Sequence, residues 1–507
     1  MTTRLLLVET CSAPRPPRDA LTAEHGLRWS LALEELVDRR GGRRRHAPRD
    51  GRGGVLSLFG IPLGAAFLAG ALRDRDVEVL HEPLILAARD GRSPRQALVH
   101  AVARQRPHVV GLTANHTVEE GVTLEFARAV KETNPATRVV VGGTHATFRA
   151  TALARSADID AVLRFEGEAS LPAWLETLDG RRSPSDVPGL VARVDGRLVE
   201  VPPGPPLDFA RAMPDYGPLH AERYAQAGIL AHVQTSRGCP HGCPFCAHAA
   251  FWGPRVRHRD AGLVADEVQL LSELGCDLFY LTDSTFSEDR ERVRELCDTL
   301  ARRGADRPVH VVETRLDRLD DEVLGWLARG GVGVVVLGVE TAAPEVLEGV
   351  PGKRSADPVR AAREAVWRIR AHGMRAYVSL ALGLPGETAE TLAATERLVE
   401  QLYADGDGLL WADAKLARAF PGTPLAREPE RFHAVVDPRY EGYDFYSGVT
   451  LHLERGAAAE RILETRRRIM ERNVRAWRER RAQDADRVAR GVARMLGTEE
   501  GMSCDAR

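Results

Sequence analysis

Residues 239–246 read Cys-Pro-His-Gly-Cys-Pro-Phe-Cys, and the rest of the chain is best interpreted outward from this stretch. It follows an apolar run over 229–235 that predicts a buried strand, while its glycine and prolines predict a short loop. Three thiolates that converge on such a loop can hold a four-iron cluster by three of its corners. The fourth iron then has no protein ligand and is open to an outside ligand, as an open zinc site takes water.

Two alternatives remain for these cysteines, a structural zinc site with His241 or His248 as fourth ligand and a chance group of free thiols. Zinc sites usually draw on two ligand pairs well apart in sequence, and no second pair follows here. Seven cysteines are too few and too clustered for a disulfide framework, which indicates a reducing, cytoplasmic compartment. We interpret the other four as incidental free thiols: Cys11, Cys276, Cys297 and Cys504.

Composition describes an ordinary globular chain of 507 residues, 44% apolar and 28% charged, long enough for about three domains. Its net charge of −2 implies no bulk attraction to nucleic acid or to an acidic membrane. Residues 55–72 are uncharged and reach the lower limit for a membrane span, but Gly60, Pro62 and Gly64 interrupt them. We therefore expect a buried loop and a core helix there, and neither a membrane span nor a signal peptide.

Residues 1–180 alternate between strand and helix patterns. The strands are expected at 4–9, 77–80, 108–113, 138–142 and 160–164, and the helices at 20–38, 62–74, 94–105, 119–132 and 168–178. Continuous apolar strands such as 138–142 are typical of parallel sheets covered by helices on both faces. The fold class predicted for this part is a flavodoxin-like, doubly wound α/β domain.

A linker is expected over 181–228, with a hairpin around Asp195-Gly196 and a proline-rich stop at 202–206. Six strand–helix repeats then fill residues 229–425. Their strands are expected at 229–235, 277–282, 308–313, 332–338, 375–382 and 411–419, and their helices at 260–274, 288–303, 319–329, 356–372 and 387–403. Parallel barrels place their chemistry at the carboxyl ends of the strands.

Residues 426–507 form a C-terminal region. An Arg-rich helix is expected over 456–496, with a buried stripe at Ile462, Ile469, Val474 and Trp477. Four aromatic residues precede it, and they either shape a substrate pocket or form a small core patch: Tyr440, Tyr443, Phe445 and Tyr446.

The cysteine triplet, with Phe245 directly before its third member, resembles the signature of the radical S-adenosylmethionine (SAM) enzymes. The resemblance implies a partial barrel and a 4Fe-4S cluster held by Cys239, Cys243 and Cys246. It also implies that SAM binds the free iron and is split to a 5′-deoxyadenosyl radical. The electron would come from an external donor such as flavodoxin or ferredoxin.

Polar residues at the ends of successive barrel strands extend the resemblance. Asp283 follows the second strand, and the resemblance implies that an acidic residue there lies near SAM or the substrate; an N-cap or turn role is the alternative. Arg315 follows the third, where its fork suits a carboxylate such as that of SAM. Glu340 ends the fourth and resembles the residue that accepts a hydrogen bond from the SAM amino group, with a structural salt bridge as the alternative. Lys353 lies in the following loop; contact with the substrate is one interpretation, but we expect this lysine to be solvated.

The fifth strand ends in Gly383-Leu-Pro385-Gly386, which resembles the family's glycine-rich turn beside the adenine. Glycine permits close approach of the backbone to a ligand. Glu387 and Thr388 also fit the first turn of the next helix, so a ligand role is not assigned to them.

Three segments at the strand ends of the first domain resemble the cobalamin-binding domain that precedes the barrel in one large subgroup. Simple turn chemistry is the alternative. An Asp-x-His-x-x-Gly motif is missing, so no lower cobalt ligand is named, and neither His116 nor His145 is assigned that role. The candidate cobalamin residues are Thr113, Gly142, Gly143, Thr144, His145, Glu166, Gly167 and Glu168.

The resemblance as a whole implies a cobalamin-dependent radical SAM methyltransferase acting on an unactivated carbon of a small-molecule or natural-product intermediate. The same architecture performing cyclisation or an oxidative rearrangement is the alternative. A methylthiotransferase would need three cysteines in the first domain, where only Cys11 is present. A non-catalytic metal- or RNA-binding module is a further alternative, which the near-neutral charge disfavours. The sequence names neither the substrate nor a catalytic residue.

Overall fold

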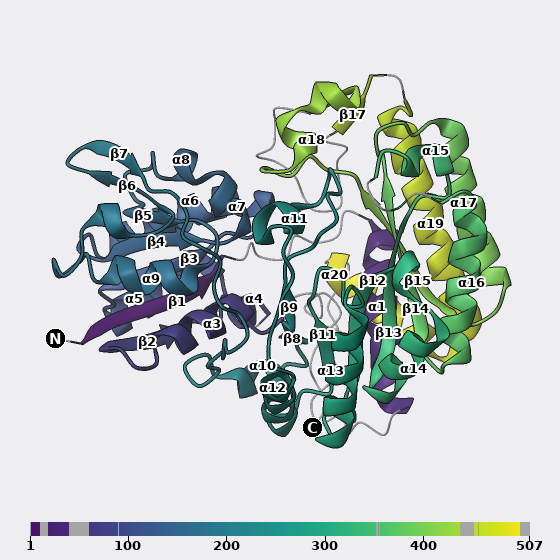
Figure 1. Cartoon of the computed structure of the whole chain (residues 1–507), viewed down its shortest axis with the longest axis horizontal. Coiled ribbons are helices and arrows are strands. Elements are labelled where there is room, and N and C mark those ends of the chain that lie inside the picture. Colours follow the sequence, from purple (N-terminus) through teal and green to yellow (C-terminus); the bar gives the residue numbers. More distant parts are fainter. Residues whose placement is uncertain are drawn as a thin grey trace, which may run out of the picture.

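The computed structural model describes residues 2–10, 19–39, 60–89, 91–350, 353, 355–436, 451–454 and 456–496. Its two large sheets stand side by side, one in the first part of the chain and one in a barrel (Figure 1). The predicted α/β fold class is confirmed for both.

The first sheet has seven strands in the order β2-β1-β3-β4-β5-β6-β7. Its first five strands are parallel, and their order is that of a flavodoxin-like sheet. The strands are β1 (Thr3–Glu9), β2 (Val77–His81), β3 (Val109–Thr113), β4 (Arg138–Gly142), β5 (Ala161–Leu163), β6 (Leu190–Val194) and β7 (Arg197–Glu200).

The hairpin expected in the linker instead extends this sheet, because β6 pairs with β5 and β7 with β6, both antiparallel. Asp195 and Gly196 turn it with φ values of 50° and 77°, as the two-residue hairpin signal requires. The helices of this part are α3 (Leu63–Leu72), α4 (Leu84–Arg89), α5 (Pro94–Gln105), α6 (Glu120–Thr133), α7 (Thr144–Phe148), α8 (Ala150–Leu153) and α9 (Gly167–Leu175).

The second sheet has six parallel strands in the order β15-β14-β13-β12-β11-β8, as predicted for a partial barrel. They are β8 (Ala231–Val233), β11 (Leu278–Leu281), β12 (Val309–Arg315), β13 (Val332–Glu340), β14 (Arg375–Leu382) and β15 (Leu409–Leu416). The helices between them are α12 (Ala261–Glu273), α13 (Arg290–Arg302), α14 (Asp321–Arg329), α15 (Pro344–Leu347), α16 (Pro358–Ala371) and α17 (Ala389–Ala404).

Successive side chains of each barrel strand alternate between the interior and the surrounding helices. On β12, Val312 belongs to the main core, whereas Val311 packs in a separate cluster with Val334 and Val336 of β13. Glu313 and Arg315 continue the series that begins with Val311, so both belong to the inner face.

Helix α1 (Ala20–Arg39) follows β1 in sequence but lies with the barrel (Figure 1). Its Leu31 and Ala32 are buried against Val311 and Val334 on the inner face of the strands. Glu24 binds Arg478 of α19 (Ala459–Arg480), and α20 (Ala485–Leu496) packs on α1 as well. The N-terminal helix thus fills the lower half of the barrel, which leaves the carboxyl end of the strands for chemistry.

The C-terminal helix predicted over 456–496 is two helices, because the backbone leaves helical geometry at Arg481, where φ is −137°. The predicted stripe on α19 is buried as expected. The four clustered aromatic residues, Cys11 and Cys504 lie outside the described residues. Cys276 and Cys297 are buried free thiols. Among the residues described, no helix is both long and apolar enough to cross a membrane.

Candidate active site between the two sheets

The cysteine loop leaves the barrel through β9 (Ser236–Arg237) and is closed by its own backbone. The N–H of Cys239 donates to the carbonyl of Gly253 at 3.0 Å, and that of Cys246 to the carbonyl of Cys243 at 3.1 Å. Gly238 has φ = 103°, and a Cβ there would lie 2.0 Å from the carbonyl oxygen of Arg255. Only glycine fits this position, so the Arg-Gly-Cys sequence fixes how the loop leaves the strand.

The three thiols form one electrostatic group at the barrel mouth. Burial raises the pKa of Cys243 to about 11, and its neighbours include Lys353, Cys246 and Glu340. Burial also raises the pKa of Cys246, although the backbone N–H groups of Ala249 and His248 act in the opposite direction. Thiols kept protonated in the apoprotein become thiolates when a metal binds. The donor set therefore fits a cluster held by three sulfur atoms.

His241, one of the two candidate zinc ligands, pairs with a carboxylate through one ring nitrogen. Nε2 of His241 lies 2.7 Å from Oε2 of Glu288, so this ring is engaged with a carboxylate. Within the described part of the chain, no three His, Cys, Asp or Glu side chains gather closely enough to hold a single metal ion.

Glu340 ends β13 in a left-handed conformation, with φ = 66°. Non-glycine residues adopt this conformation at a cost and concentrate at functional sites. Its buried carboxylate forms an ion pair with Nζ of Lys353, which also donates to the carbonyl of Gly338 at 2.9 Å. The expectation of a solvated Lys353 was therefore wrong, because the lysine neutralises a carboxylate that is removed from water.

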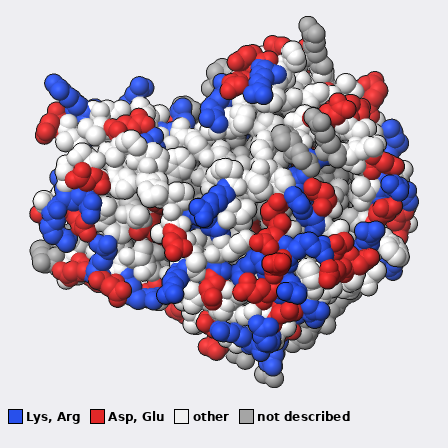
Figure 2. Space-filling view, viewed as in Figure 1, with Lys and Arg blue, Asp and Glu red and all other residues white. Residues whose placement is uncertain are grey.

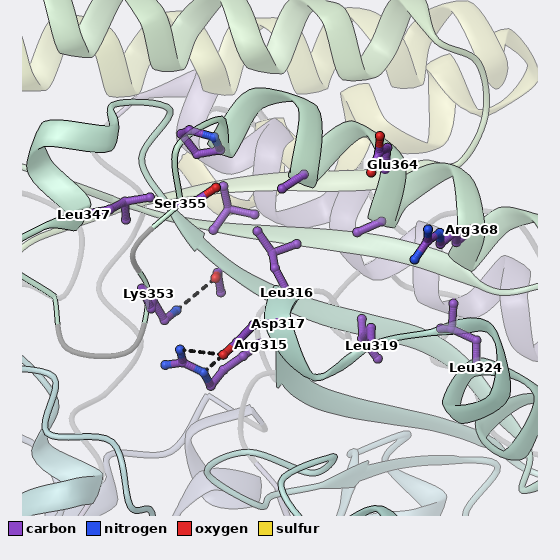
Figure 3. A pocket seen from close by; sticks show the side chains of 15 residues that line it. Arg315, Leu316, Asp317, Leu319, Leu324, Leu347, Lys353, Ser355, Glu364 and Arg368 are labelled. Atoms are coloured by element: carbon purple, nitrogen blue, oxygen red, sulfur yellow. Dashed lines mark hydrogen bonds and ion pairs between the residues drawn. The ribbon is translucent and has the colours of Figure 1, made fainter.

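Arg315 lies beside this pair and is also buried. Its guanidinium donates to both carboxylate oxygens of Asp317, at 2.9 and 3.2 Å. Figure 3 shows Arg315 and Lys353 at one end of a pocket of about 230 Å³, whose far end carries Glu364 and Arg368 of α16. Arg315 and Lys353, two barrel cations near Cys243, thus line this pocket.

Asp283 follows β11 and binds the segment that joins β8 to β9. It accepts hydrogen bonds from the N–H groups of Thr235 and Ser236, both at 2.8 Å, and from the hydroxyl of Thr235. This arrangement anchors the segment that leads into the cysteine loop. Contact of Asp283 with SAM stays a prediction.

The turn after β14 has the backbone that its glycines predict. Gly383 and Gly386 have φ values of 87° and 89°. Gly383 is buried against α19, where a Cβ would lie 3.2 Å from Cδ1 of Ile462, whereas Gly386 is exposed. Pro385 lies between them and is partly exposed, and Phe245 packs on a small apolar cluster at the ends of β14 and β15.

Glu387 is a residue of this turn to which the sequence assigned no ligand role. Its side chain is fully buried, and its Oε2 accepts the N–H of Gly383 at 2.5 Å. Its Oε1 has no hydrogen-bond partner within the described structure. Burial raises the pKa of Glu387 to about 7.

The carboxyl edge of the first sheet is built from backbone and small side chains. Gly142, Gly143 and Thr144 are partly exposed there, beside Thr113 at the end of β3. Gly143 has φ = 107°, and a Cβ would lie 2.6 Å from the carbonyl oxygen of Ala114. An edge of glycine backbone and small side chains of this kind fits a large ring that carries amide side chains.

The charged candidates at this edge are already engaged. Nε2 of His145 lies 2.6 Å from Oε2 of Glu120, a carboxylate that also binds Arg149, and the ring is almost wholly buried. Glu166 and Glu168 bind Arg237 of β9 at 2.7 and 2.6 Å. Direct contact of these side chains with cobalamin stays a prediction, and Gly167 between the two glutamates begins α9.

The two edges meet at helix α11 (Ala247–Trp252), which starts directly after Cys246 and lies against α7 (Figure 1). The exposed side chain of His248 on α11 is in electrostatic range of Glu313 and Lys415 of the barrel and of His116 in the first domain. The cysteine loop, the barrel mouth and the first sheet therefore border one space.

Two tyrosine–carboxylate pairs on the inner barrel wall were not predicted. The hydroxyl of Tyr280 donates to Glu313 at 2.7 Å, and that of Tyr377 to Asp413 at 2.6 Å. Lys415 lies 3.7 Å from Asp413 and is about half exposed. The alternation of side chains along a strand could have predicted their carboxylates. It places Glu313 on the same face of the strand as Arg315, and Asp413 on the same face as Lys415.

Two family models match the chain in the places where these edges lie. The B12 binding domain matches residues 51–175, and the radical SAM superfamily matches residues 233–399. The chain belongs to the radical SAM enzymes that carry a B12-binding domain. Its cofactors are accordingly a 4Fe-4S cluster, SAM and cobalamin.

Relatives of this radical SAM enzyme include methyltransferases and cyclases. An uncharacterised methyltransferase of Pyrococcus horikoshii is 28% identical over 381 residues, which is 73% of this chain and 79% of the relative. The anaerobic magnesium-protoporphyrin IX monomethyl ester cyclase of Rubrivivax gelatinosus is 28% identical over 423 residues, covering 80% and 73% of the two chains.

A solved structure has the same fold. It is the radical SAM methyltransferase TsrM of Kitasatospora setae with cobalamin and a [4Fe-4S] cluster bound. The TM-score is 0.64 at 22% identity, and the match covers 84% of this chain and 74% of TsrM. This likeness confirms the architecture of two sheets with a helical C-terminal region.

Proposed function

We propose that this enzyme is a cobalamin-dependent methyltransferase that methylates an unactivated carbon of a small molecule. The observation that carries the proposal is the contact of α11 with α7, because α11 starts at the last cysteine of the loop and α7 at the B12 edge. A reactive centre made at the barrel mouth would then form next to that edge, as a transfer between positioned groups requires.

The chain's own residues would divide the work at the barrel mouth. Cys239, Cys243 and Cys246 would hold the cluster, which supplies the electron that splits SAM. Glu340 would accept a hydrogen bond from the SAM amino group, and Arg315 would bind its carboxylate.

The backbone beyond the fifth strand and its surroundings would complete the SAM site. Gly383, Pro385 and Gly386 would lie along the adenine, with Phe245 as an apolar neighbour. Asp283 would hold the segment before the cysteine loop in place. These assignments rest on strand-end position and on the geometry described above.

Cobalamin would lie on the first-sheet edge and supply the methyl group to the substrate. Thr113, Gly142, Gly143 and Thr144 would approach it through backbone and small side chains. His145 and the segment Glu166-Gly167-Glu168 would stabilise the edge without contacting cobalamin through their charged groups. The side chains of His145, Glu166 and Glu168 already bind other residues of the protein.

The inner barrel wall would receive the substrate. Glu313, Asp413 and Lys415 place charges of both signs below the mouth, which suits a polar small molecule that itself carries charge. We further propose that a flavodoxin or ferredoxin supplies the electron and that the reaction takes place in the reducing cytoplasm.

The test is anaerobic reconstitution with iron, sulfide and hydroxocobalamin, followed by gel filtration and then by incubation with SAM and a reductant. Near one cobalt per chain, with formation of both S-adenosylhomocysteine and 5′-deoxyadenosine, is the expected result. Absence of retained cobalt from protein with an intact iron–sulfur spectrum would overturn methyl transfer.

A radical cyclase or oxidative rearrangement enzyme is the second candidate, favoured by the match to the cyclase over 423 residues. The same experiment separates the two, because methyl transfer consumes one SAM as a methyl donor. A cyclase would retain cobalt and release 5′-deoxyadenosine without S-adenosylhomocysteine.

A further inference from the structure

Arg237 lies two residues before Cys239, at the end of β9, and only 3% of it is exposed. The intervening Gly238 packs so closely on the carbonyl of Arg255 that a Cβ there would lie 2.0 Å from its oxygen. Arg237 is therefore joined to the cysteine loop by only two peptide units.

Its guanidinium reaches into the other domain. Nη1 donates to Oε1 of Glu166 at 2.7 Å, and Nη2 donates to Oε1 of Glu168 at 2.6 Å, while Nε donates to Gln234 at 2.9 Å. Arg257 of β10 (Arg257–His258), the partner strand of β9, also binds Glu166, at 2.9 and 3.0 Å. Glu166 is the N-cap of α9 and Glu168 lies in its first turn, next to the B12 edge.

Three aromatic rings cover the guanidinium group of Arg237. Its central carbon lies 4.2 Å from the ring centre of Phe209, 4.6 Å from that of Trp252 and 5.0 Å from that of Phe67. Trp252 ends α11, and Phe67 belongs to α3 of the first domain. Rings from both domains thus shield the ion pairs from water. In such a buried site the guanidinium keeps the fixed fork geometry of its two carboxylate contacts more strictly than at a surface.

We propose that Arg237, with Glu166 and Glu168, is a positioning residue that fixes the B12 edge at one separation from the cysteine loop. The inference rests on the proposed function, since the separation matters when both cofactors act on one substrate. It predicts that methyl donation from SAM depends on Arg237 while radical formation at the cluster does not. A shift of about 1 Å between reacting groups lowers a rate about 100-fold.

The test compares Arg237→Lys and Glu168→Gln with wild-type holoenzyme. Lysine keeps the charge but cannot bind two carboxylates as a fork, and Glu168→Gln keeps the size of the side chain. The control is Glu200→Gln, which removes the Arg164–Glu200 ion pair of 2.6 Å at β7, the last strand of the first sheet. Iron and cobalt contents are measured first, followed by S-adenosylhomocysteine and 5′-deoxyadenosine.

We expect both variants, but not the control, to lower S-adenosylhomocysteine formation by about 100-fold, with 5′-deoxyadenosine and both metals retained. Magnetic coupling between cob(II)alamin and the reduced cluster, measured by electron paramagnetic resonance, should show a broadened distance distribution.

An unchanged product ratio and distance would overturn the positioning role. Loss of iron or cobalt in both variants would also overturn it, because Arg237 would then be needed to form the sites. Wild-type protein without cobalt would refute the proposed function itself.

Discussion

The two carboxyl edges of this enzyme present opposite surfaces to the space between them. At the barrel mouth the inward side chains are charged, and Glu340 is held in a left-handed conformation beside Lys353. At the first-sheet edge the charged side chains are bound within the protein, and backbone and glycines remain. One edge is built to bind polar groups, and the other to lie against a large flat surface.

The face shown in Figure 2 carries no large patch of one charge sign. On the face shown in Figure 2, lysines and arginines are interspersed with aspartates and glutamates. This distribution agrees with the net charge of −2.

The largest effect is expected at the cysteine loop. Cys243→Ala should abolish the reconstituted iron–sulfur absorbance and 5′-deoxyadenosine formation, because a cluster held at three corners loses a third of its protein ligands. Cys297→Ala is the control, since that thiol is buried in the barrel core away from the loop. A normal spectrum in Cys243→Ala would remove the cluster from this loop.

The next effect concerns the charged edge. Glu340→Ala should weaken SAM binding to the reconstituted protein by about 1.5–3 kcal/mol, the range for a hydrogen bond to a charged group. Titration calorimetry with SAM measures it, and an unaltered affinity would exclude Glu340 from the site.

Lys353→Met sharpens this prediction, because Lys353 holds the same carboxylate in the structure. If the lysine competes with the SAM amino group, the variant binds SAM more tightly than wild type. Weaker binding would instead show that Lys353 contacts SAM.

A buried carboxylate at the same mouth gives a pH-dependent effect. Burial raises the pKa of Glu387 from 4.5 to about 7, so the folded protein retains a proton that the unfolded chain releases. The stability contributed by this group is complete below pH 4.5 and is lost as pH rises through 7. Glu387→Gln should therefore stabilise the protein increasingly from pH 5 to 8, by on the order of 3 kcal/mol at the upper end.

Unfolding midpoints of the two proteins across this pH range measure the effect. Glu390→Gln, an exposed position on α17, is the control and should show no such trend. A constant difference between Glu387→Gln and wild type would indicate that the native carboxyl titrates normally.

The sequence alone predicted those features that depend only on residues close together in the chain. The cysteine spacing, the glycine turn at 383–386 and the six barrel strands follow from local pattern, and the structure has each of them. Side-chain contacts that no local sequence pattern encodes could not be predicted in this way. Lys353 was expected in solvent because no local pattern places it against the carboxylate of Glu340, which lies 13 residues earlier in the chain.

The first-sheet edge shows the same limit more clearly. Glu166 and Glu168 were predicted as cobalamin residues because they follow a strand, which is a statement about position only. Their partner Arg237 lies 71 and 69 residues away in sequence, and no local pattern joins the three. The placement of α1 inside the barrel is likewise determined by packing against α19 and α20.

The smallest predicted effect tests whether the first-sheet edge acts through its backbone. Gly143→Ala places a Cβ 2.6 Å from the carbonyl oxygen of Ala114 at a φ of 107°, so the loop after β3 must move. We expect a loss of about 1–2 kcal/mol in stability and a matching loss of cobalamin retained after gel filtration. Gly121→Ala is the matched control, because Gly121 lies within α6 with open space around it and should tolerate alanine. If Gly143→Ala lowers stability but retains cobalamin fully, the edge does not bind the cofactor through this backbone, and the contrast between the two edges would lose its functional meaning.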